Sequence, residues 1–103
     1  MNDERKLLGL LGLAARARKL VFGTDRVCET ARAFSYLGVV LIASDASENT
    51  VKRIKNCCKY YGIECRSLQC GMDDLSHAVG KGNNVSAVGV TDENFASAVI
   101  KLF

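Results

Sequence analysis

Several features that mark enzymes and nucleotide-binding proteins are missing from this sequence. It has no G-x-S-x-G segment and a single histidine, His77, which falls inside an expected helix and is interpreted as a surface residue. Gly80, Lys81 and Gly82 lack the spacing of a Walker phosphate loop and its following Ser or Thr, so this segment is predicted to be a turn. These absences argue against a hydrolytic triad and against a phosphate-binding loop.

The sequence also lacks any C-x-x-C pair. The number of cysteines is odd, and their spacing is not that of zinc ligands. The five are Cys28, Cys57, Cys58, Cys65 and Cys70. Adjacent Cys57 and Cys58 point in different directions if their segment is helical. We therefore expect free thiols, no bound metal and a reducing cytoplasmic location.

No apolar stretch is long enough to span a bilayer. The N-terminus imitates a secretory signal, because Arg5 and Lys6 precede an apolar run over residues 7–13. However, Asp3 and Glu4 interrupt the basic region, and the leucines and alanines that follow repeat at the spacing of an amphipathic helix. The segment is therefore predicted to be a retained helix, and no membrane partner is expected.

The composition is that of a globular protein with an uneven charge distribution. The 103 residues suffice for one domain, and they are 49% hydrophobic and 24% charged. Residues 1–66 carry twelve Lys and Arg against seven Asp and Glu, whereas residues 67–103 carry two against four. The basic part is compatible with a nucleic-acid partner, although such residues on a helix also occur simply as a solvated face.

Helical and strand patterns alternate along the chain. The expected helices cover residues 3–17, 24–34, 48–61, 73–79 and 92–103, and the expected strands are Leu20–Phe22, Val39–Ala43, Ile63–Leu68 and Val85–Val90. Thr24 or Asp25 is expected to cap the second helix, and Thr91 or Asp92 the last. The continuous apolar run over residues 39–43 predicts a central strand covered on both faces. Together with the helical crossovers, it predicts one partly parallel sheet between helices.

Four segments carry a family resemblance. Residues 7–23 (LLGLLGLAARARKLVFG) resemble the opening of the short bacterial branch of the L-seven-Ae and L-thirty-e ribosomal-protein superfamily. Residues 43–50 (ASDASENT) resemble the turn after its central strand, residues 75–80 (LSHAVG) its L-G-x-A-x-G helix, and residues 89–96 (GVTDENFA) its closing strand and helix. Ser76 replaces a glycine of that pattern, but the segments occur in the family's order across most of the chain.

The resemblance implies an α/β fold, a three-layer α/β/α sandwich around a mixed four-stranded sheet, with residues 1–103 as a single RNA-binding domain. It implies no enzymatic activity and, as partner, kink-turn RNA, in which adjacent sheared G·A pairs bend the double helix sharply. Such an RNA would be ribosomal or regulatory. No cofactor and no small-molecule substrate are expected, and the chain is expected to be a monomer in the cytoplasm.

In this family the RNA site combines three segments at one end of the sandwich, which here are residues 23–26, 45–51 and 68–72. Helix starts present unpaired backbone N–H groups, and a kink opens base edges that a regular RNA helix hides. Basic residues just before the glycine turn add charge for phosphates. The expected RNA-binding residues are Arg18, Lys19, Gly23, Thr24, Asp25, Arg26, Asp45, Ser47, Val51, Leu68, Gln69 and Cys70.

One departure from the family concerns the start of the second helix. The family pattern G-T-N-E-x-x-K becomes G-T-D-R-V-C-E over residues 23–29, so its final charge is reversed at Glu29. Asp25 can accept hydrogen bonds from guanine N1 and N2, and Arg26 can bind guanine O6 and N7 or a phosphate. The contacts that read the RNA are therefore expected to differ from those of the family.

Three other interpretations stay open at this stage. A protein-interaction module on the same scaffold, with weak or lost kink-turn specificity, is the main alternative, and a thiol-based redox protein is another. The candidate residues also have purely structural roles available: Asp25 as a helix cap, Arg26 and Glu29 as solvent-facing charges, and Leu68 and Cys70 as loop packing.

Overall fold

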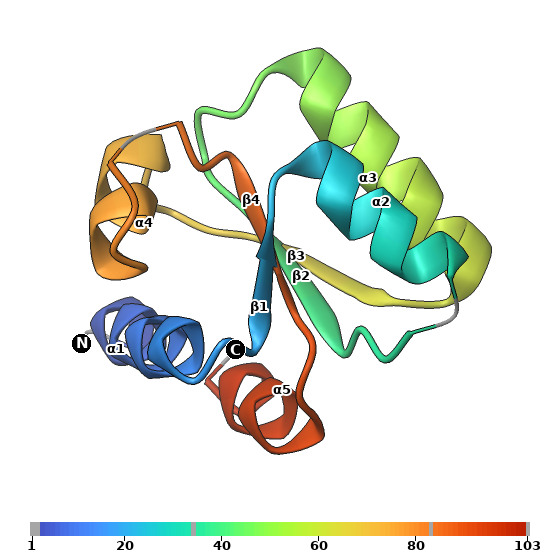
Figure 1. The fold of residues 1–103 in the computed structure, drawn as a ribbon. Helices are drawn as coiled ribbons and strands as arrows, with labels where there is room; N and C mark the ends of the chain where they lie inside the picture. The colour runs from blue at the N-terminus through green and yellow to red at the C-terminus, as the bar shows by residue number, and fades with distance from the viewer. Residues whose placement is uncertain (1–2, 34, 83, 103) are drawn as a thin grey trace.

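The computed structural model describes residues 3–33, 35–82 and 84–102, which form a sheet between two layers of helices (Figure 1). Its elements are, in order, α1 (Asp3–Arg16), β1 (Leu20–Phe22), α2 (Thr24–Arg32), β2 (Val39–Ile42), α3 (Glu48–Tyr61), β3 (Glu64–Ser67), α4 (Met72–Ala78), β4 (Ala87–Val90) and α5 (Glu93–Ile100). The predicted alternation of helices and strands is confirmed, with ends that differ by a few residues. The predicted ends of the second helix at Phe34 and of the last helix at Phe103 lie outside the described residues.

The sheet is four-stranded and mixed, with the strand order β1-β4-β2-β3. β2 pairs with β3 in parallel, whereas β4 is antiparallel to both β1 and β2. Val40 is paired with Cys65 on one side and with Gly89 on the other, so β2 is an inner strand, as predicted. It follows that β1, β2 and β3 run in one direction and only β4 runs against them.

Helices cover both faces of the sheet. α2 and α3 pack on one face, and α1, α4 and α5 pack on the other (Figure 1). Successive side chains of β2 alternate between the two cores, because Val39 and Leu41 join the α1, α4 and α5 side while Val40 and Ile42 join the α2 and α3 side. This double burial is the physical reason for the unbroken apolar run of β2. The predicted three-layer α/β/α sandwich is confirmed.

β3 is shorter than predicted because it is an edge strand. Only Glu64–Ser67 pair with β2, and three of these four residues are exposed. Gly62, with φ +69°, ends α3 in the left-handed conformation, as its position after the helical pattern predicts. β3 therefore leaves one row of backbone groups without a strand partner.

Of the two predicted helix caps, that of α5 is confirmed and that of α2 is wrong, and α3 has a cap at Ser47 that was not predicted. Ser47 caps α3 by accepting a hydrogen bond from Thr50 N at 3.1 Å, and Asp92 caps α5 by accepting one from Phe95 N at 3.0 Å. The expected cap of α2 by Thr24 or Asp25 is wrong. Gly23 occupies the cap position, and no side chain accepts a hydrogen bond there.

A close approach between α1 and α4 depends on one glycine. A Cβ atom on Gly12 would lie 2.8 Å from the carbonyl oxygen of Ala78, whereas a Cβ on Gly9, one turn earlier, would meet nothing within 4 Å. The backbones of α1 and α4 therefore approach each other closely at Gly12 and Ala78. None of the helices in the described part of the chain is long and apolar enough to cross a membrane.

Candidate nucleic-acid interface

The predicted site segments meet at one edge of the sheet, which we call the rim and define as residues 23–26, 44–51 and 68–72. β1, β2 and β3 run in the same direction, so their C-terminal ends lie at this edge. The helices that follow them, α2, α3 and α4, all begin there (α2 and α3 in the upper part of Figure 1, α4 at its left). The backbone N–H groups in the first turn of α2 and α3 therefore point toward the same side of the molecule.

Gly23 forms the corner between β1 and α2. Its N–H donates to the carbonyl oxygen of Ala87 at 2.9 Å, and its own carbonyl accepts from Val27 N at 3.0 Å. Its φ is +87°, and a Cβ at this position would meet nothing within 4 Å. The glycine is thus required by the backbone angle and not by crowding. Thr24, next to it, is the first residue of α2 and is half-buried.

Asp25 is held by an ion pair between two helices. Its Oδ1 lies 2.9 Å from Nη2 of Arg53 on α3, and the side chains are 83% and 51% exposed, respectively. Asp25 does not cap α2, because the helix begins one residue earlier, at Thr24, with Gly23 at the cap position. Ion pairs this exposed contribute about 0–1 kcal/mol, so a competing ligand displaces the arginine at little cost.

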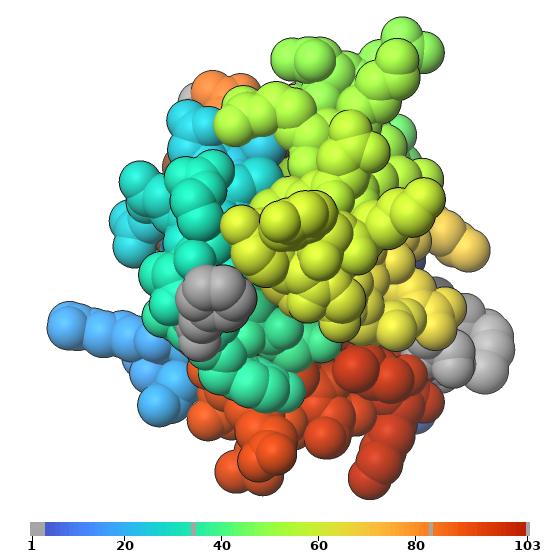
Figure 2. Space-filling view, turned by 90° about the vertical axis from the view of Figure 1, so that its right-hand side faces the viewer, coloured from blue at the N-terminus to red at the C-terminus, as the bar shows by residue number. Residues whose placement is uncertain are grey.

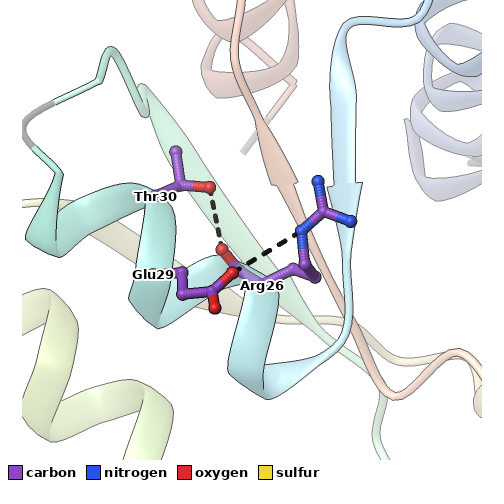
Figure 3. Close-up of polar contacts among 3 residues, drawn as sticks. All are labelled: Arg26, Glu29 and Thr30. Atoms are coloured by element: carbon purple, nitrogen blue, oxygen red, sulfur yellow. Dashed lines mark hydrogen bonds and ion pairs between the residues drawn. The ribbon is translucent and has the colours of Figure 1, made fainter.

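Arg26 and Glu29 lie one helical turn apart on the outer side of α2 (Figure 3). Arg26 Nε is 3.9 Å from Glu29 Oε1, at the outer limit of an ion pair, and both side chains are about two-thirds exposed. The Thr30 hydroxyl donates to the carbonyl oxygen of Arg26 at 2.8 Å. Arg26 and Glu29, two of the residues that depart from the family pattern, are therefore accessible, and their charged groups face each other.

The second and third rim segments are joined by hydrogen bonds. Asp45 Oδ1 accepts from Met72 N at 2.8 Å, and Ser44 N donates to the carbonyl oxygen of Cys70 at 2.9 Å. Asp45, in the turn after β2, therefore provides a hydrogen-bond acceptor for the first backbone N–H group of α4. Ser47 caps α3 as described, and Val51 is half-buried against the core between α2 and α3.

The loop before α4 is held by Glu4, a residue that sequence reasoning did not assign to the site. Its two carboxylate oxygens accept from Gln69 N at 2.8 Å and from Cys70 N at 2.7 Å. These partners lie about 65 residues along the chain, so no local pattern points to the contact. Burial, with the nearby Glu4 carboxylate as second cause, raises the pKa of the Cys70 thiol to about 11. Leu68 is only 4% exposed, so its side chain supports the loop from below.

Lys81 is a second residue next to the rim that the sequence analysis missed. Its Nζ lies 4.6 Å from the ring centroid of Phe22, the last residue of β1 and the neighbour of Gly23. The Gly80–Gly82 segment was predicted to be only a turn. The loop is fixed by Ser76, whose buried hydroxyl accepts from Val85 N at 2.9 Å. The serine that replaces the family's glycine therefore has a defined hydrogen-bonding role.

Arg18 and Lys19 do not join the rim. They lie before β1, at the opposite end of the strand from Gly23, where the carbonyl of Lys19 accepts from Thr91 N at 2.8 Å. The blue segment between α1 and β1 projects at the lower left of Figure 2, far from the starts of α2 and α3 at the top. The structure thus separates these two residues from the other predicted site residues, although only three residues of β1 lie between Lys19 and Gly23 in the sequence.

All five cysteines are free thiols. Burial and a hydrogen bond with Cys28 raise the pKa of Cys57 to about 11, whereas a hydrogen bond from Cys58 lowers the pKa of Cys65, and the positive charge of Lys55 adds to this effect. The pKa of Cys58 is raised, chiefly by its hydrogen bond to Cys65. Among the described residues, no three His, Cys, Asp or Glu side chains are grouped so that they could hold a metal ion.

Comparison with known proteins gives concordant matches in sequence and in structure. The chain is 40% identical to the RNA-binding protein YlxQ of Bacillus subtilis (strain 168) over 93 residues, 90% of each chain. It is 33% identical to the RNA-binding protein YlxQ of Enterococcus faecium, over 98% of this chain and 94% of that one.

Two solved structures have the same fold. A protein of unknown function from Bacillus halodurans superposes with a TM-score of 0.87 at 33% identity, covering 94% of this chain and 95% of that one. The 15.5 kD RNA binding protein of Giardia lamblia superposes with a TM-score of 0.75 at 15% identity, covering 100% and 92%. Residues 5–100 match the Ribosomal protein L7Ae/L30e/S12e/Gadd45 family, and the chain belongs to that family.

Proposed function

We propose that this protein binds RNA through the rim and recognises a kink-turn or a similarly bent element with adjacent sheared G·A pairs. It does so as a single-domain monomer in the cytoplasm, on ribosomal or another structured RNA, without catalysing a reaction. The family membership and the RNA-binding proteins among its relatives support an RNA partner. The convergence of the starts of α2 and α3 with the loop before α4 is the observation that carries the proposal.

The rim offers complementary groups to a bent RNA. A regular A-form helix hides its base edges in a deep and narrow major groove, whereas a kink exposes them. The Gly23 corner has no Cβ, so a base or a phosphate approaches the first N–H groups of α2 closely. In this arrangement Asp25 accepts hydrogen bonds from guanine N1 and N2, and Arg26 binds guanine O6 and N7 or a phosphate.

The rim charges are available for such contacts at small cost. The ion pairs of Asp25 with Arg53 and of Arg26 with Glu29 are both largely exposed, and each contributes about 0–1 kcal/mol. A charged hydrogen bond in a closed interface contributes about 1.5–3 kcal/mol. Exchange of the exposed pairs for RNA contacts is therefore favourable. The carboxylates of Glu4 and Asp45 remain bound to backbone N–H groups and keep the loops in place.

A gel-shift titration tests the specificity. The protein is titrated against a kink-turn RNA and against the same RNA with its sheared G·A pairs replaced by Watson–Crick pairs, at several salt concentrations. We expect the kink-turn RNA to bind more tightly at every salt concentration. Equal affinity for the two RNAs would reject recognition of the bend and would favour a protein-interaction role on this scaffold.

Substitutions on α2 test the place of the site. Arg26→Glu at the rim is expected to weaken kink-turn binding by about tenfold or more, because a charged hydrogen bond is lost and a repulsive charge is added. Arg32→Glu makes the same charge change at the other end of α2 and serves as the matched control. Glu29→Lys releases Arg26 and adds a cation, so it is expected to tighten binding. An equal loss of RNA affinity in Arg26→Glu and Arg32→Glu would show that the rim is not the binding site.

A further inference from the structure

Three lysines form a stripe along α3. Lys52, Lys55 and Lys59 are spaced three and four residues apart, so they lie on one side of the helix. All three are exposed, and within the described residues none of them makes an ion pair. We call these residues the lysine stripe. Unlike Arg26 and Arg53, these lysines have no acidic partner in the described part of the chain.

The stripe faces away from α2 and toward the edge strand β3. Arg53, on another side of α3, is bound to Asp25 of α2, whereas Lys55 is close enough to Cys65 of β3 to stabilise its thiolate. Figure 2 looks onto this layer and shows α3, in yellow-green, between α2 and the yellow β3. Because α3 begins at the rim, the stripe leads from the rim along the side of the molecule over about 10 Å.

The opposite layer carries the opposite charge. α2 and α3 together contain six Lys and Arg against three Asp and Glu, whereas α1, α4 and α5, the helices of the opposite layer, contain three Lys and Arg against five Asp and Glu. A polyanion that reaches past the rim is thus attracted to the α3 side and repelled from the α4 and α5 side. The charge distribution therefore favours one orientation of a bound polyanion on the protein.

We propose that the lysine stripe binds the phosphate backbone of one of the two RNA stems that leave the bend, so that this stem lies along α3. This inference rests on the proposed function, since it requires an RNA held at the rim. The lysines act as point charges on phosphates, and they add affinity without reading sequence. The rim then recognises the bend, and the lysine stripe determines which of the two stems lies along α3.

Salt titration of charge-neutral variants tests the stripe. One variant carries Lys52→Gln, Lys55→Gln and Lys59→Gln. Its matched control carries Lys6→Gln, Arg16→Gln and Lys101→Gln, which remove three exposed charges from α1 and the end of α5. Each protein–phosphate contact adds about 0.9 to the slope of log affinity against log salt, so the stripe variant is expected to lower that slope by about 2 to 3. The control is expected to keep the wild-type slope.

Shortening the RNA stems one at a time locates the stripe on the ligand. Removal of the stem that lies along α3 is expected to abolish the difference between the wild type and the stripe variant, and removal of the other stem is expected to preserve it. A wild-type slope in the stripe variant overturns the inference, as does an equal fall in the control or a difference that survives both truncations. Unchanged thermal melting of both variants shows that they are folded.

The same measurements separate the two proposals. If the stripe variant still distinguishes sheared G·A pairs from Watson–Crick pairs but keeps the wild-type slope, only the inference about the stripe fails. If the wild type does not distinguish the two RNAs while the stripe variant has a lower slope, the recognition of the bend fails and the phosphate contact stands.

Discussion

Alanine substitution of two glycines in α1 gives a quantitative test of the packing under the rim. Gly9 and Gly12 lie in the same helix, and glycine in a helix interior costs about 1 kcal/mol relative to alanine. A Cβ on Gly9 would meet nothing within 4 Å, so Gly9→Ala is expected to raise the free energy of unfolding by up to about 1 kcal/mol.

Gly12→Ala has the same gain in helix propensity but a steric cost. Its Cβ would lie 2.8 Å from the carbonyl oxygen of Ala78, a backbone atom that moves only if α4 moves. Overpacking of this kind costs about 1–3 kcal/mol. Because the propensity gain is common to both substitutions, the difference between the two variants measures the steric cost alone, and we expect it to be about 1–3 kcal/mol in favour of Gly9→Ala.

Urea unfolding followed by circular dichroism measures both values. The slope with denaturant should be the same in the wild type and in both variants, so that shifts of the midpoint report stability. If the two substitutions change the stability by the same amount, the backbone contact between α1 and α4 does not limit packing, and the reasoning is refuted.

Three further predictions concern stability and thiol chemistry. Ser76→Ala removes the acceptor of the buried Val85 N–H and is expected to cost about 1–3 kcal/mol of unfolding free energy in the same urea assay; a neutral result would contradict the role given to this hydroxyl. Folding raises the pKa of Cys57 and Cys70 from 9.0 to about 11, so stability is fully present below pH 9 and falls as the pH rises toward 11. Replacement of both residues by serine should flatten this decline, and an unchanged pH profile would oppose it. The lowered pKa of Cys65 predicts that iodoacetamide modifies this thiol first near neutral pH, which peptide mass spectrometry after brief labelling would detect; faster labelling of Cys57 or Cys70 would contradict it.

The parts of the fold with a strong local pattern were predictable from the sequence. β2 is covered on both faces, so nearly every residue in it is apolar, and its position was predicted to within one residue. Asp92 caps the helix that follows it directly, so short-range reasoning identified it as a candidate. Edge strand β3 carries a weaker pattern because most of its side chains are exposed, and its ends were predicted less well.

Contacts between distant segments were not predictable in this way. Asp25 was expected to cap α2, but the helix begins before it, at Thr24, and its carboxylate pairs with Arg53 of α3. Glu4 and the loop at Gln69 are 65 residues apart, and nothing near either residue indicates the contact. Arg18 and Lys19 are close to Gly23 in sequence. However, the extended strand β1 separates them, so they lie at one end of the strand and Gly23 lies at the other.

The place of β4 in the sheet constrains the order in which this chain acquires structure. β1 has β4 as its ladder partner, and β4 also lies between β1 and β2, although it is the last strand to leave the ribosome. Until residues 87–90 are synthesised, β1 lacks its strand partner, and among the described residues no strand hydrogen bonds join it to the β2–β3 pair. Closure of the sheet is therefore a late event that depends on strongly non-local pairing, and the Gly23 corner, whose N–H is bound to Ala87, takes its final shape only then.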